Sequence, residues 1–228
     1  MPAPVAERLS GRRDENYGMR LYLSSYRLGD HPELFAQLVT GHRRGWVIMN
    51  ALDGMDEGRR RADLEVQIAD LRSIGLAAED FDLRQQNSES IRARFGNPDF
   101  VWVRGGNVFT LRAAMAKSGL DALVVEHVRS DNMVYAGFSA GSCVLAPSLA
   151  GLELCDPVDF ALATYGAVCT DGLGILDRPI VPHLRSPGHP ETELLGAVAM
   201  NYDAQGQPYW ALDDGQALII DGAEPRVV

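Results

Sequence analysis

Short apolar runs alternate along this chain with longer segments in which apolar residues recur at helical spacing. Residues 46–51 read Trp-Val-Ile-Met-Asn-Ala, a run typical of a buried strand. Residues 57–74 instead carry leucines and isoleucines three and four positions apart, a stripe typical of a helix, and Gly75 follows as a stop signal. Strands that alternate with helices are connected by right-handed crossovers. We therefore expect an α/β fold whose mostly parallel sheet is sandwiched by helices on both faces.

The same alternation continues through most of the chain. A run at 133–137 leads directly into Ser139, and residues 140–146 are expected to form a helix after it. Residues 208–212 and 217–220 flank Asp213-Asp214-Gly215, a turn signal, so we expect them to form a hairpin. The remaining expected strands are 19–24, 78–83, 100–103 and 180–182, and the remaining expected helices are 31–40, 107–117, 120–129 and 190–202.

The composition fits one globular domain. Of the 228 residues, 46% are hydrophobic and 23% are charged, which is enough apolar material for a sizeable core. Residues 1–18 are rich in Pro, Arg, Asp and Glu and lack apolar periodicity, so we expect a mobile N-terminal tail there. Residues 19–228 are expected to form a single α/β domain.

Charge and cysteine content limit the partners and the compartment. The formal net charge of −10 disfavours nucleic acid and anionic membranes as partners. No apolar run approaches the ~18 residues of a membrane span, and the first residues have no signal-peptide core. The cysteines, 3 in all, form no Cys-x-x-Cys pair, which favours a reducing compartment, so we expect a cytoplasmic protein. The sequence leaves a homodimer open.

Ser139 is the candidate nucleophile. It is the middle residue of Gly137-Phe138-Ser139-Ala140-Gly141, between an expected strand and an expected helix. In a nucleophile elbow of this kind, glycines permit a sharp strand-to-helix turn that exposes the serine Oγ. The following backbone N–H, that of Ala140, can then bind an oxyanion. The alternative interpretation is a tight glycine turn with a serine that caps the helix.

A serine nucleophile requires a base, and His183 is the best candidate. It follows the apolar run 180–182 and would stand at the carboxyl end of a strand, where α/β proteins gather their functional residues. His189 is the rival, because a short loop could bring it to the same cleft. For the orienting acid we favour Asp156, which gives the chain order Ser, Asp, His. The competing carboxylates are Glu153, Asp159, Asp171 and Asp177, and the non-catalytic alternative for Asp156 is an Asx-type turn before Pro157.

A second loop of interest, Arg104-Gly105-Gly106-Asn107, lies between an expected strand and an expected helix. Gly105 and Gly106 let the backbone approach a ligand, and their N–H groups with the helix N-terminus at Asn107 could complete an oxyanion hole or contact substrate. A tight turn capped by Asn107 explains the same residues equally well. A dinucleotide fingerprint is excluded because its third glycine is missing. No His, Cys and carboxylate cluster has metal-ligand spacing, so we expect neither a metal nor another cofactor.

Three segments together resemble the peptidase E family, the serine peptidases of family S51 that include aspartyl dipeptidases and, more distantly, cyanophycinases. They are residues 100–107 (Phe-Val-Trp-Val-Arg-Gly-Gly-Asn), 135–141 (Tyr-Ala-Gly-Phe-Ser-Ala-Gly) and 181–183 (Val-Pro-His). The resemblance implies a class I glutamine amidotransferase-like (flavodoxin-like) sandwich. It also implies that Ser139 is the nucleophile, His183 the base and Asp156 the third catalytic residue, with oxyanion-hole donors at the main-chain N–H groups of Gly106 and Ala140.

The activity implied by the resemblance is hydrolysis of small peptides, of the dipeptidase type, through an acyl-enzyme. Cys143 is a departure, because it stands where the aspartyl dipeptidases carry Asn, one helical turn after Ser139. This leaves a preference for an N-terminal aspartate open, although a packed thiol is the simpler interpretation of Cys143 itself. An acidic substrate would pair with Arg104, Arg178 or Arg185.

Two alternatives to a peptidase keep the same scaffold. One is an esterase, an amidase or a cyanophycinase-like hydrolase, which would cleave a different bond with the same nucleophile. The other is a non-catalytic homologue that binds a small molecule at the serine turn. Labelling of Ser139 by a serine-directed probe separates the second alternative from the first.

Overall fold

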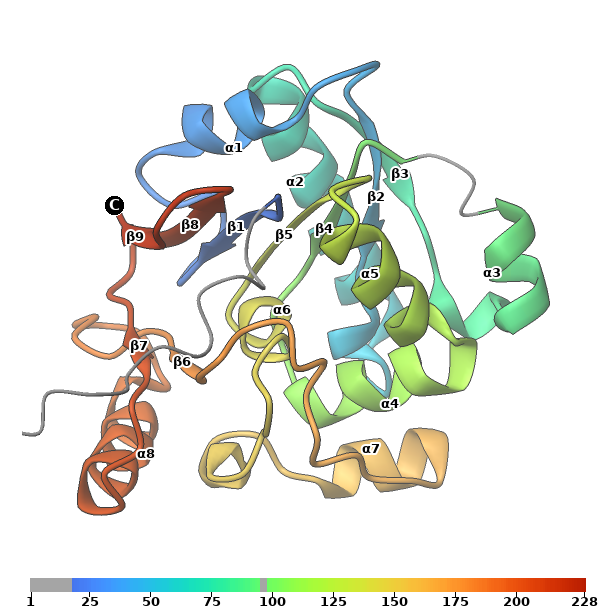
Figure 1. Cartoon of the computed structure of the whole chain (residues 1–228). Helices are drawn as coiled ribbons and strands as arrows, with labels where there is room; N and C mark the ends of the chain where they lie inside the picture. Colours follow the sequence, from blue (N-terminus) through green and yellow to red (C-terminus); the bar gives the residue numbers. More distant parts are fainter. Residues whose placement is uncertain (1–17, 95–97) are drawn as a thin grey trace, which may run out of the picture.

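A seven-stranded sheet with the strand order β3-β2-β4-β5-β1-β8-β9 forms the centre of the protein (Figure 1). The computed structural model describes residues 18–94 and 98–228, so the expected N-terminal tail lies, apart from Gly18, outside the described residues. Strands β3, β2, β4, β5 and β1 run parallel, whereas β8 pairs antiparallel with both β1 and β9, so the predicted mostly parallel sheet is confirmed. The strands are β1 (Arg20–Ser24), β2 (Arg44–Ile48), β3 (Ala77–Asp80), β4 (Phe100–Val103), β5 (Val134–Phe138), β8 (Ala217–Asp221) and β9 (Arg226–Val227).

Helices cover both faces of the sheet. In β4, Val101 and Val103 join one buried cluster with α4 and α5, whereas Phe100 and Trp102 join another with α1 and α2. Because both faces are covered, β4 and β5 are buried at every position, whereas the edge strand β3 is mostly exposed and carries Glu79 and Asp80. The helices are α1 (Pro32–Leu38), α2 (Glu57–Ser73), α3 (Ser88–Arg94), α4 (Val108–Ser118), α5 (Leu120–Arg129), α6 (Ala140–Cys143), α7 (Asp159–Tyr165) and α8 (Thr192–Ala204), with 3-10 turns η1 (Asn50–Leu52), η2 (Leu83–Gln85) and η3 (Leu152–Leu154).

The ends of α4 follow from local sequence. Asn107 precedes the helix, and its side chain accepts a hydrogen bond from the Thr110 N–H, which satisfies a donor that has no partner within the helix. Gly119 follows the helix in the left-handed conformation, with φ +80°, which glycine adopts at little cost. The helix expected at residues 107–117 is therefore found, displaced by one residue at each end.

The expected hairpin across Asp213-Asp214-Gly215 is wrong. Strand β7 (Trp210–Ala211) pairs in parallel with β6 (Ile180–Val181) in a separate two-stranded sheet, whereas β8 pairs with β1. The register with β1 runs from Ala217 opposite Ser24 to Asp221 opposite Arg20. This long pairing buries β8 and completes the hydrogen bonds of β1, which a local hairpin would leave open. The Asp-Asp-Gly segment instead links the two sheets.

The parallel strands β1, β2, β4 and β5 all end at the same edge of the sheet. Their carboxyl ends lead into Ser25, Asn50, Arg104 and Ser139 respectively. In parallel α/β sheets this edge is where ligands bind, because the loops that leave it converge.

None of the described helices is long and apolar enough to cross a membrane.

Candidate active site

Ser139 occupies a strained turn between β5 and α6. Its φ of +51° and ψ of −120° lie outside the regions that a residue with a Cβ normally adopts, which costs on the order of 1–3 kcal/mol. The Ser139 N–H donates to the carbonyl oxygens of Ser24, at 3.3 Å, and Ser25, at 3.1 Å. These bonds tie the serine turn to the end of the neighbouring strand β1. The turn is therefore held by tertiary contacts as well as by its own sequence.

At two positions near Ser139, neighbouring atoms lie so close to the backbone that only glycine fits. A Cβ on Gly141 would lie 2.1 Å from the carbonyl oxygen of Val103, and a Cβ on Gly105 would lie 2.8 Å from the Ser139 Cβ. Both distances are shorter than any real Cβ contact, so a side chain at either position would displace the backbone. Because they lack a side chain, Gly141 and Gly105 thus let β4, β5 and Ser139 pack together.

Main-chain N–H groups without a protein acceptor surround this turn. Among the described residues, those of Gly105, Gly106 and Ala140 donate to no protein atom. The Asn107 N–H, in contrast, donates to the Ala51 carbonyl at 3.0 Å. The Asn107 side chain is also engaged, since its Nδ2 donates to the Pro157 carbonyl at 2.8 Å while its Oδ1 caps α4. Asn107 therefore acts as a cap, and the free N–H groups are those of the glycines and Ala140.

His183 follows β6 and is almost completely buried, with 1% of its surface exposed. Its Nδ1 lies 2.5 Å from Oδ1 of Asp214, and its main-chain N–H donates to Oγ of Ser25 at 2.9 Å. The Ser25 hydroxyl in turn donates to Asp214 Oδ1 at 2.9 Å. Because the Ser25 carbonyl also accepts the Ser139 N–H, Ser25 connects the serine turn to the histidine and its carboxylate.

Burial lowers the pKa of His183 below its usual range, and the neighbouring His189 lowers it further, while the hydrogen bond and charge of Asp214 partly oppose this shift. The ring is therefore neutral at pH 7. A carboxylate beside Nδ1 keeps the ring hydrogen on that nitrogen, so the lone pair is left on Nε2. That is the protonation state that a general base requires.

His189, the rival base, lies in the same cluster. Its ring stacks on that of His183 with 3.6 Å between centroids and 6° between planes. Its Nδ1 accepts a hydrogen bond from the Glu191 N–H at 3.3 Å. Tyr26 faces both rings edge-on, at 6.0 Å from His183 and 5.7 Å from His189. The direct carboxylate partner belongs to His183, not to His189.

Asp156, the expected third catalytic residue, does not pair with His183. Its Oδ2 accepts a hydrogen bond from the Val108 N–H at 2.8 Å, at the start of α4. Burial raises the pKa of Asp156 to about 7, more than that hydrogen bond lowers it. Sequence reasoning missed Asp214 because it assigned the Asp-Asp-Gly segment to a hairpin turn. The signal that could have found it is an acidic pair next to a glycine at the end of an expected strand.

The other carboxylates considered for this role are engaged elsewhere or begin other elements. Glu153 accepts from the Gly151 N–H, Asp177 pairs with Arg178, Asp159 begins α7, and Asp171 forms an isolated bridge with Ser148. The Cys143 thiol is buried and donates to the Ile180 carbonyl at 3.5 Å, so it is the packed thiol that the sequence predicts.

The three arginines that could bind an acidic substrate are each paired with a carboxylate of the chain. Arg104 Nε lies 2.5 Å from Asp63, Arg178 Nη2 lies 2.7 Å from Asp177, and Arg185 Nε lies 3.0 Å from Asp213. Arg104 also donates to the Gly105 carbonyl at 2.6 Å and lies over the ring of Phe138. The positive charge of each of these three guanidinium groups is therefore partly balanced by a carboxylate of the chain.

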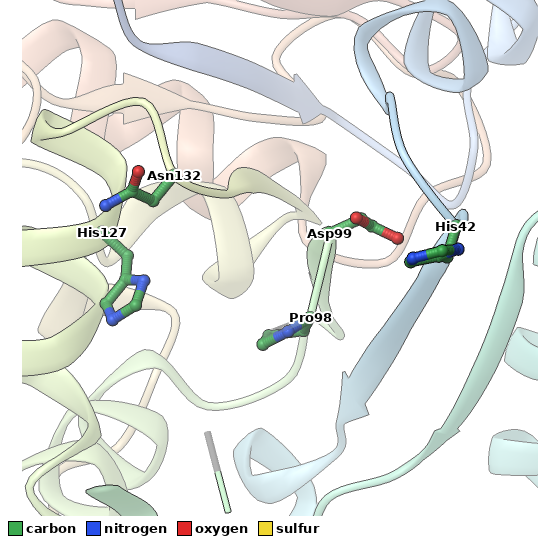
Figure 2. Close-up of a pocket in the computed structure, with 5 residues that line it drawn as sticks. All are labelled: His42, Pro98, Asp99, His127 and Asn132. Atoms are coloured by element: carbon green, nitrogen blue, oxygen red, sulfur yellow. The ribbon is translucent and has the colours of Figure 1, made fainter. Parts of the chain in front are cut away.

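A separate pocket lies at the opposite edge of the sheet, where β2, β4 and β5 begin (Figure 2). It is lined by His42, Pro98, Asp99, His127 and Asn132. The Asp99 carboxylate already accepts the Arg44 N–H at 2.9 Å. None of these five described lining residues is a serine or a cysteine, and we assign the pocket no part in the chemistry at Ser139.

Comparisons with known proteins find similarity to peptidases. The chain is 28% identical to an uncharacterized peptidase of Listeria monocytogenes over 156 residues, 68% of this chain and 72% of that protein. It is 34% identical to peptidase E of Streptomyces coelicolor over 98 residues, 42% of this chain and 36% of that protein.

Solved structures show the same fold. A candidate peptidase E protein of Listeria monocytogenes superposes with a TM-score of 0.77 at 23% identity, over 92% of this chain and 98% of that one. A peptidase from an acI-B1 actinobacterium gives 0.65 at 14% identity, over 94% and 95%. The fold is accordingly of the class I glutamine amidotransferase type. The model of peptidase family S51 matches residues 65–228, most of the chain, which therefore belongs to that family and is a serine-type peptidase.

Proposed function

We propose that the protein hydrolyses small peptides, of the dipeptide class, through an acyl-enzyme on Ser139. His183 acts as the general base, and Asp214 replaces Asp156 as the carboxylate that orients it. The observation that carries this proposal is the 2.5 Å contact between His183 Nδ1 and Asp214, tied through Ser25 to the strained turn at Ser139. A strained serine, a buried imidazole and an orienting carboxylate are the parts that nucleophilic acyl transfer needs.

In the first half of the reaction, His183 Nε2 accepts the proton of Ser139 Oγ while Oγ attacks the carbonyl carbon of the scissile peptide bond. The imidazolium that forms is stabilised by the Asp214 carboxylate beside Nδ1. It then donates its proton to the leaving amine, and the C–N bond breaks. Water, deprotonated by the same ring, releases the acyl group in the second half.

The oxyanion of each tetrahedral intermediate would be bound by the main-chain N–H groups of Gly106 and Ala140. Both lack a protein acceptor, and both lie in segments that meet at Ser139, since Gly105 packs against the serine Cβ. Preorganised donors of this kind need no rearrangement when the charge develops, and each is worth about 3–4 kcal/mol of transition-state stabilisation.

For the substrate, the charges favour a neutral N-terminal residue over aspartate. Recognition of an acidic side chain needs an available cation, and Arg104, Arg178 and Arg185 are all paired within the chain. At each of these arginines an acidic substrate would meet a charge that a neighbouring carboxylate already partly balances and would be repelled by that carboxylate. We therefore expect dipeptides with a neutral first residue to have a higher kcat/KM than their aspartyl counterparts.

The test combines a fluorophosphonate probe with a panel of dipeptides that differ only in the first residue. The wild-type protein should be labelled at Ser139 and should cleave members of the panel, and Ser139→Ala should lose both properties. Ser130→Ala, which changes an exposed serine after α5, is the matched control and should keep both. Full turnover by Ser139→Ala would exclude the mechanism, and cleavage of esters without peptides would favour an esterase on the same scaffold.

A further inference from the structure

Three potential metal ligands meet beside the proposed base. One donor atom from each of His183, His189 and Asp214 lies within 4.8 Å of the others. Two imidazoles and one carboxylate are a donor set that suits Zn²⁺ and related divalent transition metals. Sequence spacing gave no sign of this set, because Asp214 is brought to the histidines only by the link between β7 and β8.

We propose that His183, His189 and Asp214 form a binding site for a divalent transition metal, with Zn²⁺ as the reference ion, and that occupation of this site stops peptide hydrolysis. The binding half of the proposal stands on the cluster alone. The inhibitory half rests on the proposed function, because it assumes that His183 is the base.

The two rings cannot coordinate one ion as they stand. A metal lies in the plane of each imidazole, along the lone pair of the nitrogen, whereas the rings of His183 and His189 are parallel and 3.6 Å apart. No point lies in both planes, so one ring must leave the stack. His183 is buried and fixed through its main-chain bond to Ser25, which leaves His189 as the ring that turns.

His189 is placed to make that movement. It is half-buried, and its neighbour Gly188 has φ +94°, in a loop between β6 and α8. Its Nδ1 is held by a single hydrogen bond of 3.3 Å, from the Glu191 N–H, near the upper limit for such a bond. Rotation therefore gives up one weak bond and a ring stack, and it gains a metal–nitrogen bond.

Occupation would inactivate the base through its tautomer. The ion would enter between His183 Nδ1 and Asp214 Oδ1, which must move apart from 2.5 Å to about 3.4 Å, the spacing of two ligands that each lie about 2.0–2.2 Å from a tetrahedral ion. Coordination at Nδ1 moves the remaining ring hydrogen to Nε2. That nitrogen then has no lone pair for the Ser139 proton, so the first step of acyl transfer cannot occur.

Metal binding is measured on full-length Ser139→Ala, which keeps the cluster but has no nucleophile. Titration with Zn²⁺ by calorimetry should give one ion per chain, and Co²⁺ should give the visible absorption of a four-coordinate site. His189→Phe keeps a ring on His183 but offers no donor, so in the Ser139→Ala background it should weaken binding by about tenfold or more. His42→Gln, at the opposite edge of the sheet, is the control and should bind as tightly as the parent.

Inhibition is measured on the wild-type nucleophile. Zn²⁺ should reversibly inhibit dipeptide hydrolysis, a chelator should restore it, and His189→Phe should remain active but resist the ion. Absence of stoichiometric binding to Ser139→Ala, or equal binding by His189→Phe, would overturn the proposal. If Ser139→Ala binds the ion through His189 while the wild-type protein cleaves no peptide, the site stands and the proposed function fails.

Discussion

Two aspartates near the serine turn have opposite surroundings. Asp214 lies between the two sheets, with 28% of its side chain exposed, and its carboxylate faces the ring of His183 and the hydroxyl of Ser25. Asp156 lies at the start of α4, where its only hydrogen-bond donor among the described residues is the Val108 N–H. On sequence grounds Asp156 was the favoured orienting acid, whereas Asp214 was assigned only to a hairpin turn.

The difference between them is set by what can become positively charged beside each carboxylate. Asp214 faces an imidazole that becomes a cation during the proposed reaction, so its negative charge is useful at the moment when the proton moves. Asp156 faces a neutral amide, and burial raises its pKa to about 7. Asp156 is therefore suited to capping the N-terminus of α4 and not to stabilising an imidazolium.

The largest effect is expected from Asp214→Asn. The amide keeps the shape of the side chain but offers no charge to the imidazolium and can turn its NH₂ toward Nδ1, which favours the wrong tautomer. We expect kcat to fall by about 10³ to 10⁴. Steady-state kinetics on the cleaved dipeptides, with circular dichroism as a folding control, measure this. A loss smaller than that caused by Asp156→Asn would reverse the assignment of the two aspartates.

The same substitution has a pH signature. Asp214 raises the pKa of His183 against the larger effect of burial, so its removal should lower that pKa further. On acidification, the kcat/KM of Asp214→Asn should therefore begin to fall at a lower pH than the kcat/KM of the wild type. A shift of this limb toward higher pH would contradict the pairing of Asp214 with the base.

Gly105→Ala should have the next largest effect. The new Cβ would lie 2.8 Å from the Ser139 Cβ and 3.0 Å from the Phe138 carbonyl, so either the loop or the serine turn must shift. A displacement of about 1 Å at a nucleophile costs about 10²-fold in rate. Fluorophosphonate labelling rates at Ser139 report the displacement directly. Gly196→Ala, where a Cβ would have open space and φ, as at Gly105, is not positive, is the matched control and should keep the wild-type labelling rate.

Asp156→Asn should act on stability and its pH dependence more than on turnover. The folded pKa of about 7 lies above the ordinary value of 3.8, so between those values the folded carboxyl keeps a proton that the unfolded chain has lost. The free energy of unfolding therefore falls as pH rises through that window, by about 1.4 kcal/mol per unit of pKa difference. Asn accepts the same Val108 N–H bond without ionising. The free energies of unfolding, measured in urea at pH 4.5, 6 and 8, should increase for the variant relative to the wild type as pH rises. A constant difference between the two proteins at all three pH values would contradict this.

The smallest effect is expected from Arg185→Ala. Its guanidinium pairs with Asp213, next to Asp214, but 68% of the Arg185 side chain is exposed. Exposed pairs of this kind contribute about 0–1 kcal/mol. Neutral dipeptides should be cleaved at close to the wild-type rate. A selective rise in KM for aspartyl dipeptides would instead identify Arg185 as the group that recognises an acidic first residue.

The sequence by itself predicted the parallel core and the position of the serine turn. Strands such as 100–103 and 134–138 are buried on both faces. A strand of this kind appears in the sequence as an uninterrupted apolar run, so it can be predicted from consecutive residues. The glycines around Ser139 are equally local signals, because a sharp turn between a strand and a helix excludes larger side chains at those positions. The start of α4 at Asn107 and its end at Gly119 also follow from single residues.

The carboxylate beside His183 was decided only by the tertiary structure. Asp214 reaches that ring because β8 pairs with β1, far away in the chain, instead of folding back on β7. Strand partners are chosen by total burial and hydrogen bonding across the sheet, and a local turn signal such as Asp-Asp-Gly carries no information about that choice. The sequence therefore determined where a nucleophile could stand, and the pairing of distant strands determined which carboxylate lies next to His183.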